Sequence, residues 1–304
     1  MAITVNTTSE DIITPDDLLE WAIENIDPTD DESMISASER LYALRNNRDF
    51  IIEKMRQQML LLASAHDDHV AAAQATVHAA RFGSKGGFGI RSGVWTPPLT
   101  TNARSKMVQD KVLSFVTPHD HNFSLLTIGY HGPGYQTVIH EYDRSTIAGE
   151  PGEPVEISYL ETTNLTEGKI LYFRPCKDIH SQFHPTDVSI SLNLIGQSPN
   201  ITSIPQYEFD VEKQKITGLL PGTSVVDLLT PFKIIACLGG SPNTIDITNH
   251  LARAHELDYV RGAAYQALSK IDPLGFESLI AAGMDDRSLL VKNTVKEICR
   301  ELAA

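Results

Sequence analysis

Cysteine, long apolar runs and positive charge are all scarce in this sequence. The three cysteines are far apart and odd in number, so they make neither a disulfide framework nor a CxxC metal site. No stretch approaches the roughly eighteen consecutive apolar residues of a membrane span. The first residues also lack the charged start and apolar stretch of a signal peptide. These absences predict a cytoplasmic chain.

The charge balance is acidic, with 25 Lys and Arg against 39 Asp and Glu and a net charge of -14. A field of this sign repels phosphate groups, so we expect neither nucleic acid nor a membrane surface as a partner. The remaining composition, 41% hydrophobic and 21% charged over 304 residues, is that of a globular protein with room for two or three packed units.

The first part of the chain has helical periodicity. Thr14 is a candidate N-cap, because a proline and two aspartates follow it directly. Apolar residues recur at helical spacing over residues 41–62, and an Ala-rich run, His69–Arg81, stops just before Gly83 as a helix with a glycine C-cap would. We therefore expect an N-terminal helical segment over residues 1–82.

The pattern changes at Phe82. Residues 83–89 are rich in glycine and predict a loop, and residues 108–232 contain short alternating runs separated by Gly, Pro and Asn. Short strands at this spacing are typical of a jelly-roll or small barrel. We expect this central all-β barrel over residues 83–240. The strand candidates are Val112–Val116, Leu125–Gly129, Thr137–Ile139, Ile170–Phe173, Val188–Leu194 and Ser224–Val226.

The helical period returns after Pro242, and this part of the sequence contains an internal repeat. The apolar pattern of Leu257–Leu268 is repeated in Ser288–Cys299, with a turn between the two at Asp272. A repeat of this length suits a pair of HEAT-like helical units. We expect a C-terminal helical segment over residues 241–304. The two helical segments, N-terminal and C-terminal, are also the surfaces through which a homo-oligomer would form.

The strongest local signal for chemistry is His119-x-His121, which follows an apolar run. Residues i and i+2 of a strand share a face, so both imidazoles would point to the same side. A pair of surface or core histidines is an equally good interpretation of this motif alone. His180, before the alternating run that starts at Val188, is a candidate third ligand. Three neutral imidazoles on one face of a metal ion leave positions open for substrate and dioxygen, as in non-haem Fe(II) sites.

These residues resemble the two metal motifs of the cupin superfamily. The first is His119-x-His121 followed by Gly132, and the second is Gly168 with Pro175 and, five residues on, His180. The resemblance covers residues 105–235. It implies a cupin barrel that holds a divalent metal.

The ligand set resembles one branch of that superfamily. The positions where cupins often carry a glutamate are Leu125 and Leu126, so the site is similar to the three-histidine variety. The segment from Asp178 to Leu192 resembles the cysteine (thiol) dioxygenase family. That family binds Fe(II) through three histidines and adds both oxygen atoms to a thiol sulfur. The resemblance implies Fe(II), or another divalent transition metal, on His119, His121 and His180.

The family also has a Ser-His-Tyr relay and an arginine that holds the substrate carboxylate. The relay positions fall near Asn193 and Ile195, so this chain departs from the pattern there. Arg91 lies in the region of the family's arginine, and Arg174, at a strand end, is a second candidate; either guanidinium could bind a carboxylate with two hydrogen bonds. An exposed loop arginine is the alternative interpretation of Arg91.

Proton transfer then falls to other residues. His184 shares a strand face with His180 in the alternating run, and Glu141 and Tyr142 stand at a strand end. We prefer His184 among these three. A turn residue before proline is the alternative for His184, and a solvated strand end for Glu141.

The sequence thus predicts a mixed fold, a central cupin barrel between two helical segments. The preferred function is that of a non-haem Fe(II), O2-dependent oxidoreductase, a dioxygenase or related oxygenase, with O2 and a small polar molecule such as an amino acid or thiol carboxylate as substrates. A cupin-type isomerase or lyase that uses its metal as a Lewis acid is one alternative. A non-catalytic ligand sensor is another.

Overall fold

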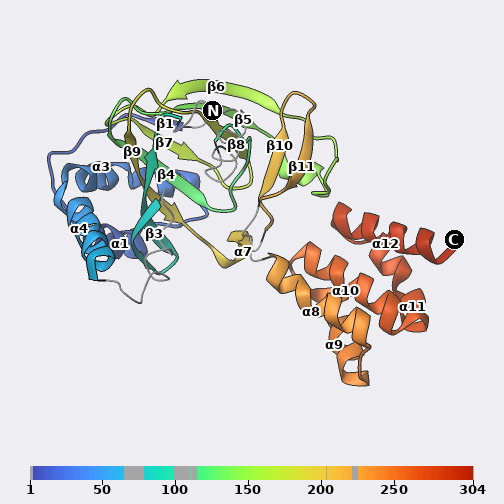
Figure 1. Cartoon of the computed structure of the whole chain (residues 1–304). Helices are drawn as coiled ribbons and strands as arrows, with labels where there is room; N and C mark the ends of the chain where they lie inside the picture. Colours follow the sequence, from blue (N-terminus) through green and yellow to red (C-terminus); the bar gives the residue numbers. More distant parts are fainter. Residues whose placement is uncertain are drawn as a thin grey trace. The chain divides into compact units, whose positions relative to one another are not determined.

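The structure is a computed structural model that describes residues 3–64, 79–98, 110, 115–202, 204–220 and 225–303. The chain divides into two compact units (Figure 1). The first comprises Met1–Tyr142 and Ile157–Ile201, and the second comprises Asp143–Glu156 and Thr202–Ala304. Within the described residues, no helix is both long enough and apolar enough to cross a membrane.

The N-terminal helices begin at side-chain caps. The Thr14 hydroxyl accepts a hydrogen bond from the Asp17 N–H while the Asp17 carboxylate accepts one from the Thr14 N–H, so the two residues form a capping box. Asp30 caps the second helix in the same manner. The expectation of an N-terminal helical segment is confirmed for four helices: α1 (Pro15–Asn25), α2 (Asp31–Ser36), α3 (Ser38–Asn46) and α4 (Asp49–Ser64).

The next segment corrects two expectations. Residues 69–78 of the expected third helix lie outside the described residues, but Ala79–Arg81 belong to strand β2 (Ala79–Lys85) and not to a helix. The glycine-rich stretch is not a loop, because β2 pairs antiparallel with β3 (Phe88–Trp95). Gly86 and Gly87, both with positive φ, make the hairpin turn between them.

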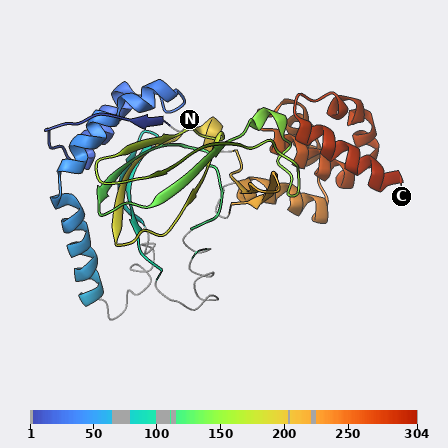
Figure 2. The same cartoon turned by 90° about the horizontal axis from the view of Figure 1, so that it is seen from above.

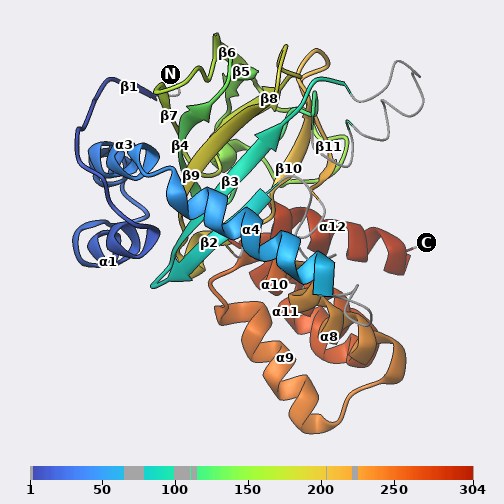
Figure 3. The same cartoon turned by 60° about the vertical axis from the view of Figure 1, so that its left-hand side comes forward.

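Two antiparallel sheets form the centre of the first unit. Figure 3 shows β3 between β2 and β9, which are its partners in a six-stranded sheet of order β1-β7-β4-β9-β3-β2. A three-stranded sheet has the order β6-β5-β8. The expected central β structure is therefore confirmed in the form of antiparallel sheets. The remaining strands are β1 (Ile3–Val5), β4 (Ser124–His131), β5 (Gln136–Glu141), β6 (Ser158–Asn164), β7 (Ile170–Phe173), β8 (Asp178–Gln182) and β9 (Ser189–Gly196).

One face of the larger sheet packs against the N-terminal helices. Figure 2 shows these helices outside the strands, along one side of them. Ile90, Leu126 and Leu194 from three neighbouring strands are buried in one cluster with Leu18 and Leu41 of the helices. The helices and the six-stranded sheet thus share a core.

The opposite face of the larger sheet meets the smaller sheet. Leu125 and Phe173 on this face cluster with Ile139 of β5. Ile139 is in register with His180 on β8, so the two side chains share a face of the smaller sheet. The interior between the two sheets therefore contains His180.

The second unit is mainly helical. The apolar stretch expected as a strand at Ser224–Val226 is instead the beginning of α8, as far as it is described, because its apolar pattern continues over fourteen residues. The two copies of the repeated apolar pattern lie in α10 and α12, which precede and follow α11 in the chain. The elements are η1 (Arg144–Thr146), β10 (Tyr207–Asp210), β11 (Lys215–Leu219), α8 (Val225–Leu238), α9 (Pro242–Ala254), α10 (Asp258–Ile271), α11 (Pro273–Met284) and α12 (Leu289–Ala303); the short helix α7 (Pro199–Thr202) straddles the boundary between the units.

Candidate metal centre

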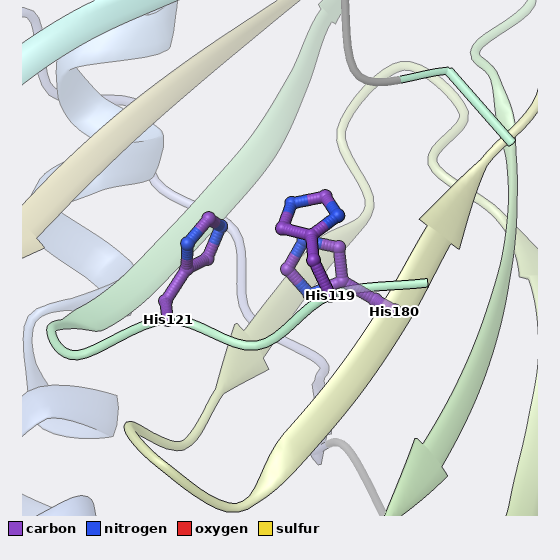
Figure 4. Close-up of side chains that lie close together, drawn as sticks. All are labelled: His119, His121 and His180. Carbon is purple, nitrogen blue, oxygen red and sulfur yellow. The ribbon is translucent and has the colours of Figure 1, made fainter. Parts of the chain in front are cut away.

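The three candidate ligand histidines converge in the first unit. Figure 4 shows His119 and His121 on one loop and His180 on the neighbouring strand β8. His119 does not lie in a regular strand, but it makes an isolated antiparallel bridge to His180. The two backbones exchange hydrogen bonds of 3.1 Å and 2.9 Å. This pairing sets the two ligands side by side, while His121 reaches the same point from the loop before β4.

The separations of the rings suit one metal ion. The candidate ligand atoms of the three histidines lie within 4.8 Å of one another. The ring centroids are 5.0 Å apart for His119 and His121, 4.6 Å for His119 and His180, and 4.8 Å for His121 and His180. Two nitrogens that bind one ion at about 2.1 Å lie at most about 4.2 Å apart. Binding therefore needs only a small inward movement, which the half-buried His121 can make.

The protonation of these rings favours a metal. Burial lowers the pKa of His180 well below its ordinary value, and the neighbouring His119, His121 and Arg91 lower it further. Burial also lowers the pKa of His119, against the hydrogen bond to the Thr117 carbonyl. Both imidazoles are therefore neutral at pH 7, which is the form that binds metals.

Two hydrogen-bonding details test the fit of a metal to these residues. The Nδ1–H of His119 donates to the Thr117 carbonyl at 2.8 Å, which leaves the Nε2 lone pair available as a ligand. His180 is fully buried, and neither of its ring nitrogens has a hydrogen-bond partner among the described residues. Such an orphaned imidazole is costly in a protein interior unless an unseen group satisfies it. A metal ion on His180 fits this arrangement.

Aromatic rings and one arginine surround the cluster. Phe123 stacks on His121 at 4.3 Å, and Phe173 lies 4.5 Å from the His180 ring. The Arg91 guanidinium lies over the ring of Phe123, 5.7 Å from its centroid. Its charge acts on both His119 and His180, as the pKa shifts of those residues show. Arg91 is thus a cation beside the histidines.

Arg91 has no acidic partner in the described part of the chain. It lies on β3 opposite Asn193 of β9, on the interior face of the larger sheet, and not in a loop. Burial lowers the pKa of its guanidinium; the nearby Tyr135 opposes this shift and Arg81 adds to it. A partly buried guanidinium without a carboxylate is a good binding site for an anion.

Arg174, the second candidate for substrate binding, is already paired. Its guanidinium donates to Asp178 at 2.5 Å and to Glu141 at 3.0 Å. The Asp178 carboxylate is fully buried, whereas Glu141 is about one-third exposed. The candidate base Glu141 is therefore bound to the same arginine.

The other two candidates for proton transfer lie in different surroundings. The Tyr142 hydroxyl donates to the buried Asp120 carboxylate at 2.7 Å. His184 has Thr96 O 2.8 Å from Nδ1 and Asp110 Oδ1 2.7 Å from Nε2, and its ring stacks on Phe115. Within the described residues, none of the hydrogen bonds or ring contacts of His184 involves the three ligand histidines.

Sequence reasoning did not identify the polar interior of the larger sheet. Thr127 and Asn193 face each other across β4 and β9, and the Thr127 hydroxyl donates to Asn193 Oδ1 at 2.5 Å. The Trp95 indole N–H donates to the buried Ser191 hydroxyl at 3.0 Å, and the Tyr135 ring lies against Trp95 with a centroid distance of 4.0 Å. The available signal was a polar residue at alternate positions of otherwise apolar strands, which marks an interior that is not purely hydrophobic.

Comparisons with known proteins show no family for this chain. No protein-family model and no curated protein matches this chain. Among solved structures, it is similar to the DMSP lyases RdDddP and RnDddQII, with 16% identity, a TM-score of 0.20, and 36% of this chain and 39% of that chain covered.

Two further structures are similar at the same level. They are a salicylate 1,2-dioxygenase from Pseudaminobacter salicylatoxidans (12% identity, TM-score 0.29, 56% of this chain and 39% of that chain) and the vicilin of the hazelnut Corylus avellana (8% identity, TM-score 0.22, 44% and 33%). The matches to these structures span less than half of their length. Likeness at this level assigns no activity to the chain.

Proposed function

We propose that this chain is a cupin-type, non-haem Fe(II) enzyme that uses O2 to oxidise a small carboxylate, such as an amino acid or a thiol carboxylate. The observation that carries the proposal is the cluster of three imidazoles beside an arginine without an acidic partner. Three neutral ligands leave the 2+ charge of an ion unbalanced. An anionic substrate would balance that charge.

His119, His121 and His180 would hold the ion. Their nitrogen donors suit Fe(II), and when bound the ion would supply electrons for the reduction of O2. The protein's own contribution is to keep the imidazoles of His119 and His180 neutral through burial and to fix the tautomer of His119 through Thr117.

Arg91 would bind the carboxylate of the substrate. The geometry of its guanidinium permits two parallel hydrogen bonds to a carboxylate. Arg91 and His121 both lie against the ring of Phe123, so a carboxylate held by Arg91 would lie near the metal ligands. Asn193 and Thr127 lie in the same row of the sheet and offer polar groups for the rest of a small polar molecule.

The first test is metal content. Protein produced with iron and purified without oxygen should contain close to one equivalent of metal, and His119→Ala or His180→Ala should remove most of it. His131→Ala, which removes an exposed histidine from the end of β4, is the control and should leave the content unchanged. Folded wild-type protein that takes up no metal would refute the proposal.

The second test is oxygen uptake by the Fe(II)-loaded protein with a panel of amino acids and thiol carboxylates. Arg91→Gln should raise KM for the carboxylate about 10- to 100-fold, because a hydrogen bond to a charged group contributes about 1.5–3 kcal/mol. Lys85→Gln removes an exposed charge from the far end of β2 and should leave KM unchanged. Turnover without oxygen consumption would instead indicate an isomerase or lyase.

A further inference from the structure

Three separate segments of the first unit meet behind the candidate ligands. They are the His119–Asn122 loop, the end of β5 at Tyr142, and the Arg174–Asp178 turn between β7 and β8. We propose that Tyr142 and Arg174 are positioning residues, which hold the ligand loop in its metal-binding conformation before any metal is present. This inference rests on the proposed function only in taking His119, His121 and His180 as metal ligands.

We call the contacts among these three segments the brace. Its first contact fixes Asp120, the residue between two ligands. Asp120 separates His119 from His121, and its carboxylate is completely buried. The Tyr142 hydroxyl donates to Asp120 Oδ2 at 2.7 Å, also in the interior. A buried carboxylate is unfavourable without hydrogen-bond donors, so Asp120 has a strong preference for the place where Tyr142 meets it. Because the side chain of Asp120 is anchored, the backbone that carries both flanking histidines is held.

The second contact fixes the backbone of His121. The Cys176 N–H donates to the His121 carbonyl oxygen at 2.6 Å. Cys176 has a φ of 53°, in the left-handed region that non-glycine residues seldom occupy. The surrounding turn must therefore impose this conformation.

Arg174 holds that turn. Its backbone N–H donates to Asp178 Oδ2 at 2.7 Å, and its guanidinium donates to both oxygens of the same carboxylate. One residue thus clamps both ends of the turn through a single buried acid. Glu141 accepts a further hydrogen bond from the guanidinium and ties the turn to β5.

Tyr142 connects the two contacts. Its hydroxyl binds Asp120 in the ligand loop, while its backbone N–H donates to the Lys177 carbonyl in the turn at 3.1 Å. The His119 and His180 backbones already pair directly, so His121 is the ligand that depends most on the brace. Removal of the Tyr142 hydroxyl should therefore loosen His121 without disturbing the sheets.

The decisive variant is Tyr142→Phe, which deletes one oxygen atom and keeps the ring. Its matched control is Tyr159→Phe, which deletes the same atom from an exposed tyrosine of β6. Metal affinity is measured on the full chain by anaerobic titration with Fe(II), and by the absorption spectrum with Co(II) as a probe of ligand geometry. Changes around metal ligands commonly cost 10- to 100-fold in affinity. We expect a loss in this range for Tyr142→Phe, a changed Co(II) spectrum, and wild-type behaviour for Tyr159→Phe.

A readout that needs no metal separates this inference from the proposed function. In metal-free protein, hydrogen exchange of the Cys176 amide should be at least tenfold faster in Tyr142→Phe, while amides of β4 and β9 keep their protection. Unchanged exchange at Cys176 together with wild-type Fe(II) affinity would overturn the brace. A wild-type protein that binds no metal would overturn the proposed function, whatever the exchange shows.

Arg174→Lys and Asp120→Asn provide a second route if Tyr142→Phe does not fold. Lysine keeps the charge but cannot bind Asp178 with two parallel hydrogen bonds, so metal affinity should fall as it does in Tyr142→Phe. Asparagine still offers an oxygen to the Tyr142 hydroxyl, so Asp120→Asn should lose less affinity than Asp120→Ala. Equal affinities for wild type and all of these variants would contradict the inference.

Discussion

Arg91 and Arg174 show how the role of a residue depends on its neighbours. Both are arginines in or beside apolar strands, and the sequence nominates both for binding a carboxylate. Arg174 already binds the carboxylates of Asp178 and Glu141, whereas Arg91 has no acidic partner among the described residues. Arg91 is therefore the arginine that we propose for substrate binding.

The surroundings of Gly134 leave no room for any side chain larger than hydrogen. It has a φ of +80°, and a Cβ there would lie 2.1 Å from the Leu165 carbonyl oxygen. Gly168 has nearly the same φ, but its nearest neighbour, Tyr42, lies at 3.6 Å. We expect Gly168→Ala to cost about 1–2 kcal/mol from its left-handed backbone alone. Gly134→Ala should cost at least about 3 kcal/mol, because the backbone must also move.

Denaturant unfolding of the two glycine variants measures this difference. The comparison removes the conformational penalty that both share, so it isolates the close approach of the backbone at Gly134. Equal losses of stability in the two variants would show that the Leu165 carbonyl is not in the way.

At the scale of elements, the β2–β3 hairpin shows how pairing overrides local pattern. Ala-rich sequence before Gly83 favours a helix, and the glycines after it favour a loop. The backbone of β3 nevertheless pairs over its whole length with β9, so the sheet satisfies its hydrogen bonds and the hairpin forms. Arg91 thereby faces the interior between the two sheets. Without this strand, the site would lose Arg91.

In the second unit, a buried ion pair joins α10 to the turn between α11 and α12. Arg261 donates to both carboxylate oxygens of Asp286, at 2.8 Å and 2.7 Å. Burial acts to raise the pKa of Asp286, but the hydrogen bonds from Arg261 and the Ser288 N–H outweigh it and leave this pKa below its ordinary value. A carboxyl group whose pKa is lower in the folded state stabilises that state above its unfolded pKa of about 4, and the contribution disappears as the pH falls through the folded pKa.

We therefore expect Asp286→Asn to lower the stability of this unit by about 3 kcal/mol at pH 7, because it leaves Arg261 buried without its acid. The difference between variant and wild type should shrink below about pH 4. Asp210→Asn, which breaks an exposed pair with Lys213, should change stability little. Denaturant unfolding followed by circular dichroism between pH 3 and 7 tests this; a difference that stays constant with pH would contradict it.

At the scale of the whole molecule, the two units have separate cores. The candidate metal centre and both tryptophans, Trp21 and Trp95, belong to the first unit. The helical core of the second unit contains none of the three histidines. A metal should therefore act on the stability of one unit.

Metal at a hundredfold excess over its Kd should stabilise the first unit by about 2.7 kcal/mol. We expect tryptophan fluorescence to report an unfolding transition that moves to higher temperature with metal. A second transition, seen in the helical signal of circular dichroism, should keep its midpoint. If both transitions move equally in a calorimetric scan with and without metal, the units do not respond separately.

The sequence by itself determined the elements whose patterns are local. The Thr14 cap, the alternating strands of residues 124–131 and 189–196, and the two helices with the repeated apolar pattern follow from side-chain periodicity and capping chemistry. His119, His121 and His180 were also identified from spacing and resemblance, and the structure brings them together. Only the tertiary structure decided that residues 79–81 are a strand, and that Asn193 and Thr127 share a row with Arg91.

The physical reason is that these outcomes depend on partners distant in the chain. The backbone of β3 is satisfied by β9, about a hundred positions further along the chain, and β2 in turn pairs with β3; no local pattern encodes the pairing with β9. In the same way, the availability of a guanidinium depends on which carboxylates the fold places beside it. Asp178 lies four positions after Arg174 and accepts its hydrogen bonds, whereas the described residues include no acid that pairs with Arg91. Spacing can nominate a ligand, but only packing decides whether it is already bound.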